Sequence, residues 1–421
     1  MKRATIGFLA LVAVVLGSTA LPAAPALQPG DYVAVIGDSI TEQRLYSLYI
    51  EDYLLMCRPA KDLRVTQFGW GGETAPGFAG RMANDCLRFK PTAATTCFGM
   101  NDGGYSPMDE GKGKRYKNGQ KSIVRQLKEA GVRAIVVGSP GVVDADTFGS
   151  NNPERAAMYN KTLAALRDIA KEVATEDGVG FANVYDAMME AMTKGKAKYG
   201  KAYHMGGGDG VHPDCNGHLV MAYAFLKGLG FDGAIGTITV DLAAGKAEAT
   251  EGHKVLSCQG GDVEVESSRY PFCFYGDPAK TNATCGVIEL IPFNEDLNRF
   301  LLVVKNAGAE KVKVTWGKTS KELAAADLAK GVNLAAAFLD NPFCEPFRAV
   351  ERKIASKQGM EVELVKTLIH SLPAFLRRAP EEKDAIERIG AGLVKSDVEA
   401  RDAAAAAAVP VRHTIKIEAV K

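Results

Sequence analysis

Short apolar runs alternate with stretches of helical periodicity from Asp31 to about Gly230. Residues 32–36 (YVAVI) form one such run and 133–138 (RAIVVG) contain another. Further strands are predicted at 63–67, 92–99 and 181–184. Uninterrupted apolar runs of this length are typical of parallel strands that are buried on both faces. Between the runs, the spacing of apolar residues predicts helices over 42–56, 77–89, 117–130, 154–175 and 213–229. The alternation predicts an α/β domain over residues 31–230, with helices on both faces of a parallel sheet.

The pattern changes after Gly230. Short β-rich runs separated by turn residues lie at 237–242, 263–267, 287–291, 300–305 and 311–316. Their spacing predicts a mainly antiparallel β-rich domain over residues 231–318. Helical patterns follow at 321–329, 346–369 and 380–408, so we expect a segment with C-terminal helices over 319–409. Residues 411–418 alternate with a period of two, which predicts that 410–421 return to the β-rich domain as a half-buried strand.

The N-terminus has the pattern of a targeting segment. Lys2 and Arg3 precede an uncharged, largely apolar run, and small residues at 24–26 end it. This order is typical of a secretory signal peptide over residues 1–26, so we expect an exported protein, periplasmic or extracellular. An uncleaved membrane anchor is the alternative, but the strongly apolar stretch is short for a membrane span. We expect no stable membrane insertion after cleavage.

Composition narrows the class of protein. The chain has 421 residues, 47% of them hydrophobic and 24% charged, which is typical of a globular protein with two domains. Lys and Arg total 51 against 50 for Asp and Glu, and the absence of a long basic run argues against a nucleic-acid partner. The eight cysteines include no CxxC pair, so the usual zinc-ribbon and thioredoxin patterns are missing. A disulfide between Cys273 and Cys285 and a set of buried free thiols both remain open.

Polar residues gather in short segments where predicted strands end or helices begin. In an open parallel sheet the carboxyl ends of the strands form the edge at which ligands bind. Each segment alone is also typical of a helix cap or a tight turn. Together they supply a serine, a histidine that follows an aspartate by three positions, and several N–H donors, which favours a catalytic site. The segments are 37–41 (GDSIT), 67–74 (QFGWGGET), 99–102 (GMND) and 209–213 (DGVHP).

In order and spacing these segments resemble the conserved blocks of the SGNH (GDSL-type) hydrolase superfamily, over residues 31–230. The resemblance implies a flavodoxin-like three-layer α/β/α sandwich and hydrolysis of esters with no metal or other cofactor. It implies Ser39 as the nucleophile, His212 as the general base and Asp209 as the carboxylate that orients it. It also implies that the N–H groups of Ser39 and Gly72 and the side-chain amide of Asn101 form the oxyanion hole.

The sequence departs from the family pattern at a few positions. Gln67 and Gly71 stand where the glycine block usually has asparagine and serine, and Gln43 replaces a common glycine. These departures bear on the loops around the substrate and leave the implied catalytic groups intact. For the large residues that flank the blocks, we consider a substrate pocket or ordinary core packing: Trp70, Met100 and Tyr105.

The chemistry that these residues allow is acyl transfer through an acyl-enzyme. We therefore expect a secreted serine esterase that deacetylates O-acetylated carbohydrate, with a small-molecule or polysaccharide ester as its substrate. One alternative is a lipid esterase, lysophospholipase or thioesterase that acts on longer acyl chains. Another is a catalytically idle polysaccharide-binding protein. A metal site is a further alternative, but its spacing fits no standard zinc motif and leaves Ser39 unexplained; its ligands would be His204, Asp209, His212 and His218.

Overall fold

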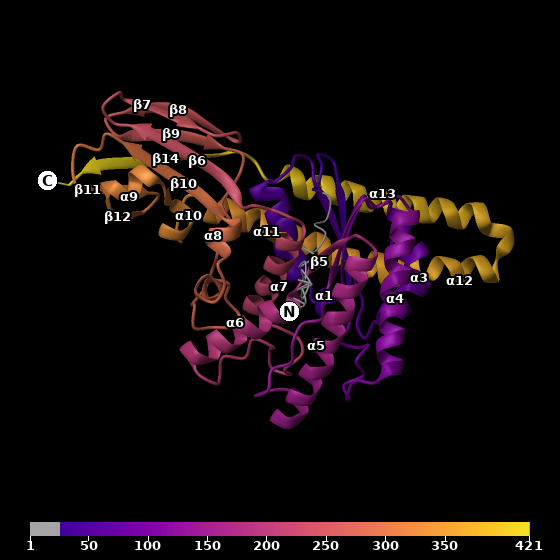
Figure 1. Cartoon of the computed structure of the whole chain (residues 1–421). Helices are drawn as coiled ribbons and strands as arrows, with labels where there is room; N and C mark the ends of the chain where they lie inside the picture. The colour runs from indigo at the N-terminus through magenta and orange to yellow at the C-terminus, as the bar shows by residue number, and fades with distance from the viewer. Residues whose placement is uncertain (1–25, 421) are drawn as a thin grey trace, which may run out of the picture.

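The computed structural model describes residues 26–420 (Figure 1). The expected signal peptide, residues 1–26, lies outside the described residues except for Ala26. Between residues 26 and 420, no helix combines the length and the apolar character that crossing a membrane requires.

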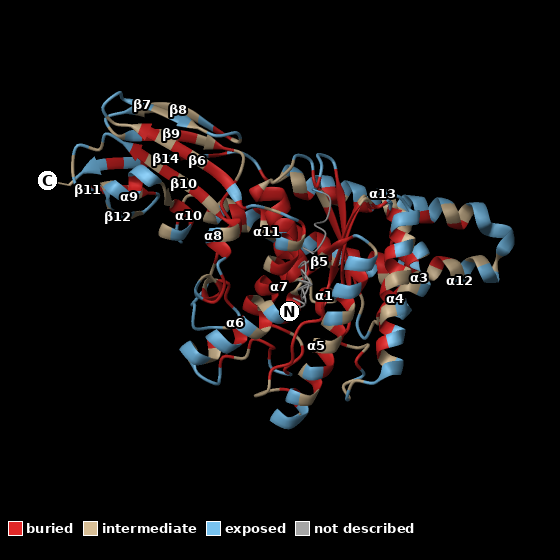
Figure 2. Ribbon diagram, viewed as in Figure 1, coloured by how far each residue is buried: buried red, intermediate tan, exposed pale blue. Residues whose placement is uncertain are grey.

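A five-stranded parallel sheet with the order β2-β1-β3-β4-β5 forms the centre of the first domain. β1, β3 and β4 are buried along their whole length (Figure 2), as the apolar sequences of β1 and β4 predict; β3 also buries Thr95 and Thr96. This strand order is that of flavodoxin-like folds, so the predicted fold class is confirmed. The strands are β1 (Tyr32–Gly37), β2 (Arg64–Gly69), β3 (Ala93–Cys97), β4 (Ala134–Gly138) and β5 (Gly180–Ala182).

Helices cover both faces of this sheet. Successive side chains of β1 point to opposite faces: Ala34 and Ile36 pack in the core beneath α3 and α4, whereas Val33 and Val35 pack in the core shared with α2 and α7. Helix α6 fills a stretch for which the sequence pattern predicted no element. The helices are α1 (Ser39–Glu42), α2 (Tyr46–Asp52), α3 (Ala75–Asp85), α4 (Glu110–Glu129), α5 (Pro153–Glu176), α6 (Val184–Tyr199) and α7 (Cys215–Gly228).

Two sheets form the β-rich domain. In one, of order β13-β10-β6-β7, β6 and β10 are parallel; in the other, of order β12-β11-β14-β9-β8, every pair is antiparallel. β14 lies between β9 and β11, which confirms that the C-terminal strand returns to this domain. The strands are β6 (Ala234–Asp241), β7 (Lys246–Ala249), β8 (His253–Gln259), β9 (Asp262–Ser267), β10 (Arg299–Lys305), β11 (Lys311–Trp316), β12 (Thr319–Ala324), β13 (Val332–Asn333) and β14 (Val411–Ala419).

Two predicted elements of this region are wrong. Residues 287–289 end a 3-10 helix (Cys285–Glu289) and 290–291 form a turn, so 287–291 are not a strand. Val287, Leu290 and Ile291 are buried at the spacing of one helical turn. Residues 321–329, predicted as a helix, begin as the edge strand β12, because β11 offers a free antiparallel edge there. Helix α9 (Ala325–Lys330) starts only after it and leads to β13 in the other sheet. The short helix α8 (Phe293–Leu297) precedes β10, and α10 (Leu334–Ala337) lies between β13 and the long helices that follow.

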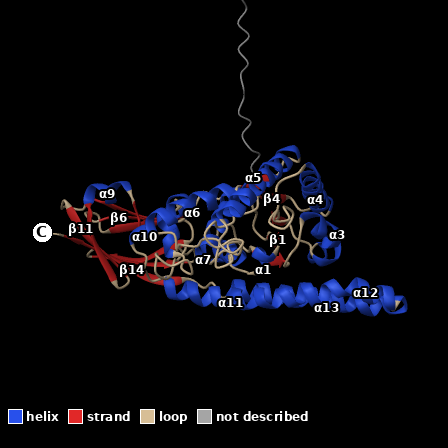
Figure 3. Ribbon diagram, turned by 90° about the horizontal axis from the view of Figure 1, so that it is seen from below, coloured by secondary structure: helices blue, strands red, loops and turns tan. Residues whose placement is uncertain are grey.

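A long helical hairpin, residues 344–406, leads away from the β-rich domain and runs along the α/β domain (Figure 3). Its first arm is α11 (Cys344–Glu363), which passes through a π-helical turn (Leu364–Ile369) into α12 (His370–Arg378). Its second arm is α13 (Lys383–Ala406), within the stretch that the sequence predicted as helical. The hairpin packs against β2, so it lies beside the sheet edge that leads into the predicted glycine block.

Candidate active site

Ser39 lies where β1 passes into α1, at the carboxyl edge of the sheet. The side chain of Asp38 caps the helix, with its Oδ1 accepting a hydrogen bond from the N–H of Ile40 at 3.0 Å. Gly37 has no room for a side chain, since a Cβ there would lie 2.1 Å from Thr41 Oγ1 and 2.8 Å from the carbonyl oxygen of Cys97. A tight turn therefore fixes the backbone on both sides of Ser39, whose side chain is half-buried.

His212 and Asp209 complete a hydrogen-bonded row with Ser39. Nε2 of His212 lies 2.8 Å from Ser39 Oγ, and Nδ1 lies 2.6 Å from Asp209 Oδ2. The second oxygen of Asp209 accepts hydrogen bonds from the N–H groups of Val211 and His212, each at 2.9 Å. The structure thus brings the three residues together in the order hydroxyl, imidazole, carboxylate, which is the arrangement of an activated nucleophile with its base and orienting group.

The electrostatics of Asp209 support this arrangement. Burial opposes its ionisation, but hydrogen bonds from the backbone and ring of His212 and from the N–H of Val211 outweigh burial and lower the pKa of Asp209 below its ordinary value. The ionised carboxylate accepts the proton of Nδ1, so the lone pair of Nε2 faces the Ser39 hydroxyl. The imidazole is thereby held in the tautomer that can receive a proton from serine.

A glycine-rich loop, residues 206–208, packs against the backbone of His212. Gly207 has a positive φ of 73°, and a Cβ there would lie 2.0 Å from the carbonyl oxygen of His212. A Cβ on Gly206 would lie 2.8 Å from the Cβ of Asp144. Only glycine permits this close approach at position 207, so Gly207 fixes the backbone of His212 by tight packing.

The glycine block and Asn101 are tied to each other. One hydrogen of the Asn101 amide is donated to the carbonyl oxygen of Glu73 at 3.0 Å, and Oδ1 accepts a hydrogen bond from the hydroxyl of Tyr105 at 3.3 Å. Gly72, next to Glu73, is exposed and has a positive φ of 73°. The side-chain amide of Asn101 has a second hydrogen that takes no part in these contacts.

The carboxylates of Asp38 and Asp102 hold the loops of the site together by accepting hydrogen bonds from backbone N–H groups. Asp102 accepts hydrogen bonds from the N–H groups of Ala75 and Gly99, each at 3.0 Å, and so connects the β3 loop to the start of α3. Burial raises the pKa of Asp102 to about 6 and that of Asp38 to about 7. These two groups hold backbone N–H groups in place close to Ser39 and Asn101.

The candidate pocket residues have different surroundings. Met100 is only 2% exposed and packs in the core, so the packing alternative describes it best. Tyr105 is half-buried and stacks on Tyr159 with their ring centroids 5.0 Å apart. Trp70 is also half-buried and lies beside Gly71 and Gly72 on the rim of the site.

Sequence patterns missed the residues that surround Trp70. Lys366 and His370, from the helical hairpin, lie 5.0 and 4.7 Å from its ring centroid, measured to Nζ and to the imidazole centroid. Glu42, on α1, contacts both Lys366 and the loop of Trp70. No local motif marks these residues, because the hairpin and the glycine block are joined only by the fold.

The residues of the alternative metal site are not gathered into one cluster. His218 is buried, its Nδ1 accepts a hydrogen bond from the N–H of Tyr46 at 3.2 Å, and its Nε2 lies 3.0 Å from Gln43 Oε1. Burial lowers the pKa of His218 to about 3. Among residues 26–420, no three His, Cys, Asp or Glu side chains lie close enough together to hold a metal ion.

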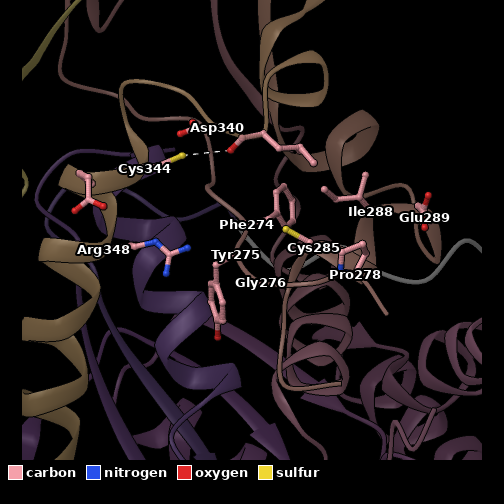
Figure 4. A pocket seen from close by; sticks show the side chains of 12 residues that line it. Phe274, Tyr275, Gly276, Pro278, Cys285, Ile288, Glu289, Asp340, Cys344 and Arg348 are labelled. Carbon is pink, nitrogen blue, oxygen red and sulfur yellow. Dashed lines mark hydrogen bonds between the residues drawn. The ribbon is translucent and has the colours of Figure 1, made fainter. Parts of the chain in front are cut away.

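A cavity of about 720 Å³ lies elsewhere, between the loop 274–289 and the start of α11 (Figure 4). Phe274, Tyr275 and Arg348 line it together with two thiols, Cys285 and Cys344, and neither Ser39 nor His212 contributes to its walls. All eight cysteines are free thiols in the structure, so Cys273 and Cys285 are not bridged. This cavity is separate from the row of Ser39, His212 and Asp209.

Comparisons with known proteins found similarity over the α/β domain and, for one solved structure, over 95% of the chain. The model of the GDSL-like lipase/acylhydrolase family matches residues 35–220. An acetylxylan esterase from Geobacillus stearothermophilus is 25% identical over 229 residues, which are 48% of this chain and 95% of the relative. A solved structure of that esterase is 23% identical over 49% of this chain and 97% of its own, with a TM-score of 0.40. The structure of a gut microbial diltiazem-metabolizing enzyme is 22% identical and covers 95% of this chain and 99% of its own, with a TM-score of 0.71. The last comparison shows that the fold of nearly the whole chain recurs in another protein.

Proposed function

Residues 35–220 belong to the GDSL-like lipase/acylhydrolase (SGNH) family, which makes the protein a carboxylic ester hydrolase, and from that premise we propose that it removes acetyl groups from O-acetylated carbohydrate. The observation that carries the proposal is the row in which Asp209, His212 and Ser39 are joined by contacts of 2.6 and 2.8 Å. Export of the protein through its N-terminal segment is part of the same proposal, because acetylated polysaccharides are large substrates that lie outside the cell.

In the proposed reaction, Nε2 of His212 takes the hydroxyl proton of Ser39 as Oγ attacks the carbonyl carbon of the ester. The tetrahedral intermediate collapses with cleavage of the bond to the sugar oxygen, which takes the proton from His212 and leaves as a hydroxyl, and the acetyl group remains on Ser39 Oγ as an ester. A water molecule then gives a proton to His212 and attacks this acetyl-enzyme, and the proton returns to Oγ as acetate departs. Asp209 stabilises the imidazolium that forms in each half of the reaction.

The negative charge of the tetrahedral intermediate would be stabilised by N–H donors. We assign this role to the backbone N–H groups of Ser39 and Gly72 and to the free hydrogen of the Asn101 amide. Fixed donors aimed at the developing oxyanion are worth about 3–4 kcal/mol each to the barrier. The hydrogen bond from Asn101 to the Glu73 carbonyl supports the assignment, since it fixes the plane of the amide relative to the loop of Gly72.

The exposure of the site supports a bulky substrate. The side chains of His212 and Asp209 are 33% and 55% exposed, so the base and its carboxylate lie at the protein surface. A surface site is accessible to an acetyl group on a polymer or oligosaccharide. The similarity to an acetylxylan esterase supports the same substrate class.

Acetate release from a panel of acetylated glycans tests the proposal. We expect wild-type protein to release acetate from at least one acetylated xylo-oligosaccharide, and Ser39→Ala to reduce the rate by at least about 10³-fold. Faster hydrolysis of decanoyl than of acetyl nitrophenyl esters, without acetate release from any glycan, would favour the long-chain esterase instead. Retention on a glycan column with no turnover, unchanged in Ser39→Ala, would favour the idle binding protein.

A further inference from the structure

The helical hairpin (residues 344–406) lies outside the stretch matched to the family, yet it reaches the rim of the active site. We propose that this hairpin positions the oxyanion turn, which we define as residues 70–72. The positioning residues are Lys366 on the hairpin and Glu42 on α1. The inference rests on the proposed ester hydrolysis, in which Gly72 donates an N–H to the oxyanion. It adds a role for a segment of the chain that no catalytic motif covers.

Glu42 connects the nucleophile helix to the turn. Its Oε2 accepts a hydrogen bond from the N–H of Gly71 at 2.5 Å, and its Oε1 accepts one from Lys366 Nζ at 2.5 Å. Because Glu42 ends the short helix that begins at Ser39, the carboxylate links the backbone of the nucleophile to the residue that precedes Gly72. Both its oxygens are occupied, one by the turn and one by the hairpin.

The ring of Trp70 is contacted by Lys366 and His370 from the hairpin and by Arg81 from α3. Lys366 Nζ lies 5.0 Å from its ring centroid and the guanidinium carbon of Arg81 lies 4.3 Å from it, which are cation–π distances. The ring of His370 packs edge-on at 4.7 Å, with its Nδ1 2.7 Å from Asp85 Oδ2. Arg81 also pairs with Asp85 at 3.0 Å, so the groups that surround Trp70 are joined to each other.

The turn needs this support because it has little packing of its own. Gly71 and Gly72 are exposed, and a Cβ on Gly72 would meet no atom within 4 Å. Gly69, by contrast, is pressed onto α1, where a Cβ would lie 2.2 Å from the N atom of Glu42. The start of the turn is therefore fixed by packing and by a hydrogen bond from the N–H of Trp70 to the carbonyl oxygen of Gly37 at 3.2 Å. Its tip is held by the carboxylate of Glu42 and by the contacts on the Trp70 ring.

Two positions at which the sequence departs from the family pattern lie where β2 and the turn contact the hairpin and Glu42. Gln67 donates its N–H to Oε2 of Glu361 on the hairpin at 3.1 Å, and its Oε1 accepts a hydrogen bond from the N–H of Gly69 at 2.9 Å. Gly71 replaces the usual serine, and a Cβ there would lie 3.0 Å from Glu42 Oε2. The glycine thus permits the close approach of the carboxylate to the backbone N–H.

The hairpin is anchored firmly enough to act on the turn. Lys357 is 2% exposed and donates hydrogen bonds to Glu361 at 2.5 Å and to the carbonyl oxygen of Val65 on β2 at 2.7 Å. The π-helical turn that follows α11 then carries Lys366 over Trp70. A rigid support of this kind is what the placement of a transition-state donor requires.

The test compares Lys366→Met with Lys366→Arg and with a matched control, Lys395→Met. Lys395 is on the same hairpin, is 78% exposed and forms an ion pair with Glu399 at 3.7 Å. We measure kcat and KM on p-nitrophenyl acetate and the thermal midpoint of each variant. We expect Lys366→Met to lower kcat by about 10- to 100-fold, since small misplacements of catalytic groups have effects of this size, with KM within about twofold. Lys366→Arg should recover most of kcat, and Lys395→Met should match wild type.

A double-variant cycle with Glu42→Ala identifies the pathway. If Lys366 acts through Glu42, Lys366→Met has little further effect on kcat in the Glu42→Ala background. A kcat of Lys366→Met within twofold of wild type, or equal losses in Lys366→Met and Lys395→Met, would overturn the inference. A drop in kcat that follows the thermal midpoint alone would also overturn it. If wild-type protein has no turnover that Ser39→Ala abolishes, the proposed function fails first, and that result is distinct from all of these.

Discussion

Replacing Asp209 by asparagine tests how the row of hydrogen bonds controls the tautomer of His212. Both oxygens of the Asp209 carboxylate accept hydrogen bonds. Oδ1 accepts them from the backbone N–H groups of Val211 and His212, each at 2.9 Å, and Oδ2 accepts one from Nδ1–H of the His212 ring at 2.6 Å. An amide has a single oxygen. If that oxygen faces the two backbone donors, the NH₂ group faces Nδ1; in the opposite orientation the NH₂ group meets two backbone N–H groups. The first orientation is favoured because it leaves no donor facing a donor.

The orientation of this amide determines which nitrogen of the His212 ring carries the proton. With NH₂ donating to Nδ1, the neutral imidazole carries its proton on Nε2, the atom that lies 2.8 Å from Ser39 Oγ. Nε2 then cannot accept the serine proton. The same exchange in serine proteases lowers kcat by about 10⁴-fold, which corresponds to about 5 kcal/mol in the barrier. Because the side chain of Asp209 is 55% exposed and water can compete for the site, we expect a loss of about 10³- to 10⁴-fold here.

The assay is the initial rate of p-nitrophenyl acetate hydrolysis under saturating substrate, with urea denaturation as a check on folding. Asp209→Glu, which keeps the charge, is the matched control and should retain more activity than Asp209→Asn. A loss smaller than tenfold in Asp209→Asn, in a variant of wild-type stability, would refute the argument that the aspartate sets the tautomer.

Three further substitutions test other parts of the account. Asn101→Ala should lower kcat on the same ester by about 10²- to 10³-fold with little change in KM, because it removes one oxyanion donor; a change below threefold would exclude Asn101 from that role. Lys357→Met should lower the free energy of unfolding, measured by urea denaturation, by about 3–5 kcal/mol at pH 8, because it leaves the buried carboxylates of Glu51 and Glu361 without their cation. The loss should be smaller at pH 5, where protonation of these carboxyl groups reduces the cost of burying them; equal losses at both pH values would contradict this. Burial raises the pKa of Asp38 from 3.8 to about 7, so its contribution to folding is complete below pH 3.8 and is lost as the pH rises through 7. The wild-type free energy of unfolding should therefore fall relative to that of Asp38→Asn between pH 5 and pH 8, and parallel curves would contradict the shift.

The sequence could predict those parts of the molecule whose signals are local. The run YVAVI followed by GDSIT predicted both β1 and the place of Ser39, because a buried strand and a capped helix each have a short pattern. The alternation at 411–418 predicted β14 for the same reason, since one face of the strand is buried. The segment order also predicted that Ser39, Asp209 and His212 lie on one sheet edge, where the structure brings them into contact.

The remainder depends on contacts between distant segments. Lys366 and Glu42 are far apart in the chain, and neither stands in a motif that marks its partner. Residues 287–291 have the composition of a strand, yet the core accepts their apolar side chains on one helical turn. Met100 lies in a motif but points into the core, and a motif does not specify on which side of the chain the core lies. In each case tertiary packing decided between local alternatives of similar energy.

If Ser39 is a hydroxyl activated by His212, it should react with diisopropyl fluorophosphate, a reagent that labels activated serines. We incubate wild-type protein and His212→Ala with the reagent, follow p-nitrophenyl acetate hydrolysis, and locate the adduct by peptide mass spectrometry. We expect activity to fall in proportion to modification of Ser39, and His212→Ala not to be labelled. Complete loss of activity with Ser39 unmodified, or full activity with Ser39 fully modified, would contradict it.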